Sequence, residues 1–109
     1  MRDLSSDDLR GPFESVAQLS KPVRAKLEDA GAHFREDEEP TQPGPTQWAA
    51  VELDNGVQYL LVHHYGHPES FIDLRAEIGA GTPQQLAQAF ANEFGIAAAE
   101  VTWTATAWP

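Results

Sequence analysis

Two β-rich runs separated by the dipeptide Asn55-Gly56 constrain the fold of this chain more than any other feature. The runs cover residues 48–54 and 57–65. Asn-Gly is the favoured pair for a two-residue type I′ turn, in which both central residues take a positive φ. The sequence therefore predicts an antiparallel hairpin at this point. A turn over residues 66–70 leads into a third run, 71–76, so we expect a three-stranded meander.

A helix is predicted over residues 82–94. Thr82 is a good N-cap, Pro83 suits the first helical position, and Gln85 completes a capping box. Gly95 is a typical C-terminal stop. Apolar residues recur at the spacing of one helical face, at Leu86, Ala89, Phe90 and Phe94.

The rest of the chain carries weaker signals. We expect a flexible N-terminus over 1–10, two short helices near 12–19 and 21–30, an acidic Pro-rich linker over 36–47 and a last strand over 101–108. The 109 residues then form one domain, 1–109, of the α+β class. It is predicted as a two-layer sandwich with element order α-α-β-β-β-α-β. Its four-stranded, mainly antiparallel sheet carries the helices on one face.

A two-residue turn also fixes which side chains share a face of the sheet. It pairs Val51 with Leu60 and Trp48 with His63. One face is then aliphatic and suited to a helix covering, with Ala49, Val51, Leu53, Leu60, Val62, Ile72 and Leu74. The other face is mixed, with Trp48, Glu52, Tyr59, Leu61, His63, Tyr65, Phe71, Asp73 and Arg75.

The mixed face has three interpretations. The protein's own helices, its linker or a second subunit could cover it. It could bind a protein partner, because Trp, Tyr and Arg dominate interface hot spots; the partner-binding candidates are Trp48, Glu52, Tyr59, His63, Tyr65, Phe71, Asp73 and Arg75. The third interpretation is a pocket over His63, Asp73 and Arg75. There Asp73 would orient the imidazole of His63, and Arg75 would hold an anionic ligand.

The charge balance limits the class of partner. Seventeen acidic residues against seven Lys and Arg give a net charge of −10. Nucleic acids and anionic membranes require cationic surfaces, so we expect neither as a partner. A basic protein partner fits this charge, as does the simpler interpretation that acidity keeps the chain soluble.

Metal and thiol chemistry have little support. The chain has no cysteine, which excludes disulfides, thiolate nucleophiles and cysteine-bound metals. Neighbouring strand residues point to opposite faces, so His63 and His64 cannot share a metal; His64 and His67, with Glu69, form only a weak ligand set. We expect no metal and no cofactor.

These observations favour a non-enzymatic interaction module of inhibitor or immunity type, acting through the mixed face. We expect it to be a homodimer where that face is self-complementary. No apolar run reaches the length of a membrane span, and the first residues lack a secretory pattern, so a cytoplasmic location is expected. The alternative is a small enzyme or ligand-binding protein with the pocket over His63, Asp73 and Arg75.

Overall fold

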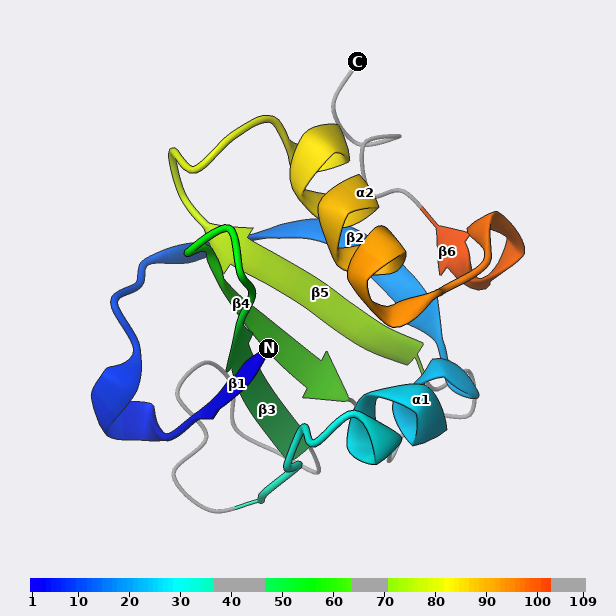
Figure 1. Ribbon diagram of the computed structural model, residues 1–109, viewed down its shortest axis with the longest axis horizontal. Coiled ribbons are helices and arrows are strands. Elements are labelled where there is room, and N and C mark those ends of the chain that lie inside the picture. Colours follow the sequence, from blue (N-terminus) through cyan, green and yellow to red (C-terminus); the bar gives the residue numbers. More distant parts are fainter. Residues whose placement is uncertain (37–46, 64–70, 103–109) are drawn as a thin grey trace.

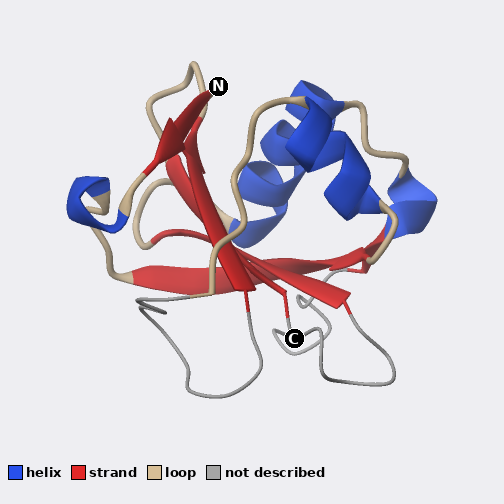
Figure 2. Cartoon of the chain, turned by 90° about the horizontal axis from the view of Figure 1, so that it is seen from below, coloured by secondary structure: helices blue, strands red, loops and turns tan. Residues whose placement is uncertain are grey.

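A computed structural model of the chain describes residues 1–36, 47–63 and 71–102. It shows an α+β fold in which an antiparallel sheet carries two helices on one face (Figures 1 and 2). The helices are α1 (Val23–Asp29) and α2 (Pro83–Phe94), and short 3-10 turns occur at Ser6–Asp8 and Ala98–Glu100. The strands are β1 (Arg2–Leu4), β2 (Phe13–Ser20), β3 (Gln47–Glu52), β4 (Gln58–His63), β5 (Phe71–Glu77) and β6 (Val101–Thr102).

The sheet has the order β1-β3-β4-β5-β2-β6. Its centre is the meander β3-β4-β5, as predicted. The predicted four strands and the order α-α-β-β-β-α-β are wrong, because the N-terminal region supplies two strands. β1 pairs with β3 and β2 pairs with β5, so these consecutive strands lie on opposite sides of the meander (Figure 1).

Strand β2 occupies most of the segment predicted as a helix over 12–19. Its register on β5 shifts between Ser15 and Ala17, which marks a β-bulge at Val16. Both Val16 and Ala17 are buried in the core under the helices. The bulge breaks the alternation of the strand, so that apolar residues fall at 13, 16, 17 and 19 and imitate the period of a helix.

Residues 1–10, for which no element was predicted, contain strand β1 and the 3-10 turn at Ser6–Asp8. In β1, Leu4 is buried against the sheet, and Arg2 pairs with Glu52 across the β1–β3 ladder. A three-residue strand with one apolar side chain has no periodicity to detect, which explains why no strand was predicted here.

The hairpin between β3 and β4 has a three-residue loop, not the predicted two-residue turn. The Leu53 amide donates to the Val57 carbonyl at 3.1 Å, and the Gly56 amide donates to the Leu53 carbonyl at 2.9 Å. Gly56 takes a φ of 82°, the left-handed residue that three-residue hairpin loops require. Val51 therefore pairs with Tyr59, and Trp48 pairs with Val62.

This one-residue shift turns β4 over while leaving β3 and β5 as predicted. Ile72 pairs with His63 and Leu74 with Leu61. The sequence predicts Tyr65 opposite Phe71 across the turn over 66–70, and the observed register differs from that pairing by one residue. The helix-covered face carries Ala49, Val51, Leu53, Tyr59, Leu61, Ile72 and Leu74, all within the main core. Leu60 and Val62, predicted there, belong to a second apolar cluster on the other face.

Helix α2 matches its prediction. Thr82 Oγ1 accepts a hydrogen bond from the Gln85 amide, and Gly95 ends the helix with a left-handed φ of 64°. Leu86, Ala87, Phe90 and Ala91 are its buried side chains, so the inner face includes Ala87 and Ala91 rather than the predicted Ala89. Helix α1 agrees with the predicted helix near 21–30, and it buries Val23 and Leu27.

Two predicted segments lie largely outside the described residues: the linker over 36–47, and the last strand beyond Thr102, which includes Trp103 and Trp108. Within the described ranges, no helix is both long and apolar enough to cross a membrane.

Candidate functional site

The observed register separates the predicted site residues into two groups. Trp48, Glu52, Phe71, Asp73 and Arg75 share the face of the sheet opposite the helices, which we call the helix-free face. Tyr59 and His63 lie on the helix-covered face instead. Tyr65 is outside the described residues. The predicted pairing of Trp48 with His63 is therefore wrong, because Val62 pairs with Trp48 on one side and with Asp73 on the other.

The half of the helix-free face over β1, β3 and β4 is closed. Leu4, Trp48, Ala50, Leu60 and Val62 form a buried cluster there, with Leu9 and Phe13 packed against it. Trp48 is fully buried, and the guanidinium of Arg35 lies 4.7 Å from its ring centroid. Trp48 thus has a core role in the described structure.

Arg10 holds the N-terminal segment over this half. Its guanidinium contacts Glu77 at 2.9 Å and Glu52 at 3.2 Å, and it donates to the Gly56 carbonyl at 2.8 Å. The Arg10 amide donates to the Gln58 side chain at 2.8 Å. The hydrogen bond from Arg10 lowers the pKa of Glu77, and the Gln58 amide, at 2.7 Å, lowers it further.

The other half, over β2 and β5, carries a polar strip. We call Ser15, Gln18, Phe71, Asp73 and Arg75 the β2–β5 strip. Ser15 Oγ donates to Asp73 at 2.9 Å, and Arg75 Nε donates to Asp73 Oδ2 at 2.7 Å. Asp73 is buried, whereas the other four are partly exposed. The strip combines an aromatic ring with a rigidly held guanidinium, which is a suitable arrangement for binding.

His63 has a different environment from the one predicted. Its Nδ1 lies 2.8 Å from Arg24 Nη1, and because a guanidinium can only donate, Nδ1 must be the acceptor. Arg24 also stacks over Phe34, 4.4 Å from the ring centroid, and contacts Glu28 at 3.4 Å. Asp73 and Arg75 lie across the sheet from this group, so the structure does not form the predicted pocket over His63, Asp73 and Arg75.

Tyr59 is also a buried residue beneath α2. Its hydroxyl donates to the Leu86 carbonyl at 2.8 Å, and its ring packs 5.1 Å from that of Phe90. Burial raises the pKa of the Tyr59 hydroxyl. Tyr59 therefore fastens α2 to the sheet in the described structure.

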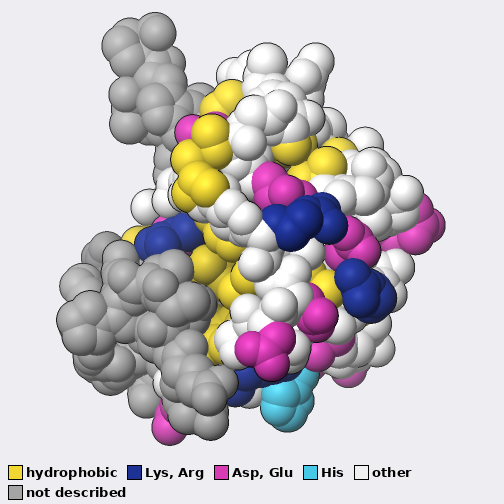
Figure 3. Space-filling view, turned by 90° about the vertical axis from the view of Figure 1, so that its left-hand side faces the viewer, with side chains coloured by type: hydrophobic (Ala, Val, Ile, Leu, Met, Phe, Trp, Pro, Cys, Tyr) yellow, Lys and Arg dark blue, Asp and Glu magenta, His cyan; other side chains and the backbone are white. Residues whose placement is uncertain are grey.

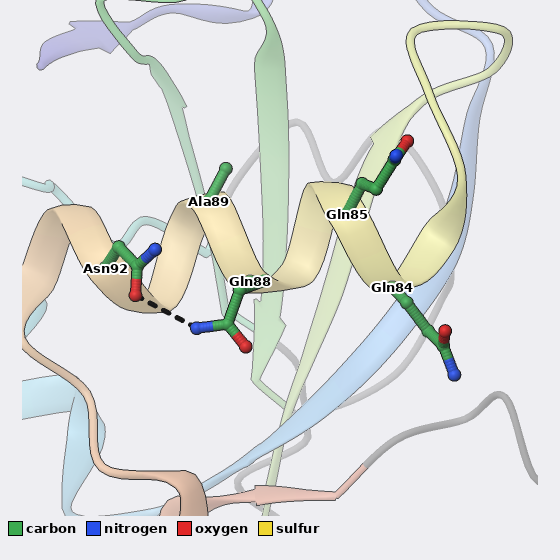
Figure 4. A pocket seen from close by; sticks show the side chains of 5 residues that line it. All are labelled: Gln84, Gln85, Gln88, Ala89 and Asn92. Atoms are coloured by element: carbon green, nitrogen blue, oxygen red, sulfur yellow. Dashed lines mark hydrogen bonds between the residues drawn. The ribbon is translucent and has the colours of Figure 1, made fainter.

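Three hollows on the surface are lined by described residues. One lies along the outer face of α2 and is lined by Gln84, Gln85, Gln88, Ala89 and Asn92 (Figure 4). Gln88 donates to Asn92 at 2.9 Å. All these side chains come from one helix and none titrates, so this hollow has no acid–base chemistry.

A second hollow lies beside α1, near Arg24, Glu28 and His63. The third lies under the N-terminal segment, between Phe13, Leu60 and Arg75. In the described part of the chain, no three His, Asp or Glu side chains are placed to hold a metal ion.

The role of Arg10 was not predicted, since a lone arginine beside Gly11-Pro12 has the appearance of a loop residue. No protein family, curated protein or solved structure matches this chain.

Proposed function

We propose that this protein is an interaction module of inhibitor or immunity type, whose partner is a basic protein. The observation that supports the proposal is that most of its Lys and Arg side chains are paired with acids of the same chain. Six of the seven Lys and Arg side chains form ion pairs with acids of the same chain, and Lys21 is the one for which the described residues show no such pair. The net charge of −10 is thus carried by other carboxylates, which produce a negative field around the molecule.

The β2–β5 strip is the proposed contact surface. Phe71 and Arg75 belong to residue types that are enriched in protein interfaces, and both are partly exposed. Asp73 is already bound by Ser15 and Arg75, which favours a binding role over acid–base catalysis. Exposed carboxylates elsewhere, such as Asp7, Asp29 and Glu93, would steer a basic partner toward the molecule.

The test is capture of partners from host lysate on the immobilised protein, at low and at high salt. We expect the captured proteins to be basic and to be released as salt rises, because screening weakens association between opposite charges. Phe71→Ser should reduce capture by about tenfold or more, as expected for a hot-spot aromatic.

Gln88→Ser on α2 is the matched control, because Gln88 is exposed on the helix layer and away from the strip. It should capture the same proteins as the original chain. Capture that is insensitive to salt, or equal in the Phe71→Ser and Gln88→Ser variants, would contradict the proposal.

A further inference from the structure

The hollow beneath the N-terminal segment has a composition unlike the rest of this acidic protein. Its volume is about 400 Å³. Leu9, Pro12, Phe13 and Leu60 form apolar walls, and Arg10 and Arg75 also line it. No carboxylate is among its described lining residues. In Figure 3, which faces this side of the molecule, hydrophobic side chains lie beside Lys and Arg side chains.

The two arginines have different roles in the hollow. The guanidinium of Arg10 already forms ion pairs with Glu52 and Glu77 and a hydrogen bond to the Gly56 carbonyl. Arg10 therefore lines the hollow without being available to bind a ligand. Arg75 uses only its Nε, which donates to Asp73. Within the described ranges, Nη1 and Nη2 of Arg75 have no hydrogen-bond partner. Neither is a fully buried atom, so both can reach a ligand.

Arg75 is also held in place before any ligand arrives. Its side chain is 16% exposed, and Asp73 is itself fixed by Ser15. Leu60 is the direct cross-strand partner of Arg75 on β4, so an apolar side chain lies next to the guanidinium. A fixed guanidinium beside an apolar wall binds a carboxylate attached to an apolar group, because its two Nη groups can donate in parallel to two oxygens.

We propose that this hollow binds a small organic carboxylate with an apolar body. The carboxylate accepts hydrogen bonds from Nη1 and Nη2 of Arg75, and the apolar body packs against Leu9, Phe13 and Leu60. This site does not require the protein-binding function proposed above. It shares Arg75 with the β2–β5 strip, but its apolar walls, Leu9, Phe13 and Leu60, are not part of that strip.

The test is a titration of the isotope-labelled protein followed by amide chemical shifts. The probes are 3-phenylpropionate, its neutral amide 3-phenylpropionamide, and acetate, which has the charge without the apolar body. We expect 3-phenylpropionate to shift amides of residues 9–13, Leu60 and Arg75, and to bind about tenfold or more tightly than either other probe.

Variants of Arg75 identify the anchor. Arg75→Gln should weaken 3-phenylpropionate by about tenfold or more, and Arg75→Lys should also weaken it because a lysine cannot make the bidentate contact. Arg75→Lys keeps the charge beside Asp73, so it remains informative if Arg75→Gln fails to fold. Arg2→Gln is the control, because Arg2 is an exposed cation paired with Glu52 outside the hollow.

Three results would overturn the proposal: equal binding of the carboxylate and the amide, unchanged binding in both Arg75 variants, or no shifts in the hollow at probe concentrations of about 10 mM. Because Arg75 belongs to both surfaces, Phe71→Ser separates the two proposals: Phe71 does not line the hollow, so this variant should reduce capture of basic proteins while binding 3-phenylpropionate as the original chain does.

Discussion

At the scale of single residues, Glu77 makes stability depend on pH. Arg10 and the Gln58 amide both donate to its carboxylate, and these hydrogen bonds keep its pKa below the ordinary value of 4.5. A group whose folded-state pKa is depressed stabilises the protein above its unfolded pKa, and that contribution is lost as pH falls through the folded pKa. The Glu77 contribution is therefore complete at neutral pH and disappears in acid.

Glu77→Gln should lower the free energy of unfolding by about 1–2 kcal/mol at pH 7, since charged hydrogen bonds are lost. The difference from the original chain should shrink below about pH 4. Urea denaturation at pH 7 and pH 3 measures both values. Glu93→Gln on the exposed face of α2 is the control and should change little. A constant difference across this pH range would show that the Glu77 charge is not responsible.

Residues also show why the candidate site could be predicted only in part. Phe71, Asp73 and Arg75 were correctly placed on one face because strand alternation decides that directly. His63 and Tyr59 were placed on the wrong face because their orientation depends on the length of two turns. Arg10 was missed because its partners, Glu52 and Glu77, are far away in the sequence.

At the scale of elements, the loop between β3 and β4 determines the faces of the sheet. The Asn-Gly pair is compatible with a two-residue and with a three-residue hairpin loop, and here the left-handed residue Gly56 closes the longer one. The side-chain oxygen of Asn55 accepts a hydrogen bond from the Val57 amide at 2.9 Å, and this bond also stabilises the three-residue loop. A shift of one residue exchanges the two faces of β4.

Gly56→Ala tests the backbone requirement of this loop. A Cβ at this position would meet nothing within 4 Å, so the only cost is the left-handed φ of 82°. We expect a loss of about 1 kcal/mol in the free energy of unfolding. Thermal or urea denaturation measures it.

Gly81→Ala is the matched control for that change, because a Cβ there meets Leu86 at an ordinary 3.5 Å and no positive φ is required. It should be near neutral. Similar destabilisation in the two variants would exclude the φ of Gly56 as the cause.

Helix α2 and strand β5 were the elements that the sequence predicted best. Both have local signals, a capping box in α2 and regular alternation in β5, that agree with their tertiary environment. Strand β2 was mistaken for a helix because its bulge at Val16 exists only in the context of pairing with β5. Tertiary contacts of that kind override local periodicity.

For the molecule as a whole, the net charge of −10 makes self-association and binding to a basic protein respond to salt in opposite directions. Two copies of this chain repel each other, so the predicted homodimer should become tighter as salt is raised from about 50 to about 500 mM. Binding to a basic partner should become weaker over the same range.

Sedimentation equilibrium of the purified chain at both salt concentrations measures how self-association changes with salt. Phe71→Ser should reduce self-association if the β2–β5 strip forms the dimer contact, whereas Gln88→Ser should not. A monomer at every salt concentration would contradict the homodimer prediction and leave the basic partner as the remaining use of the strip.

The positions of β1 and β2 have a consequence for biosynthesis. Both strands are synthesised before their partners, because β1 pairs with β3 and β2 pairs with β5, which come later in the chain. Neither strand can form its ladder when it leaves the ribosome, and the sheet can close around the meander only once translation has passed β5. In the cell, a nascent chain of this protein should depend on protection from aggregation until its second half has been synthesised.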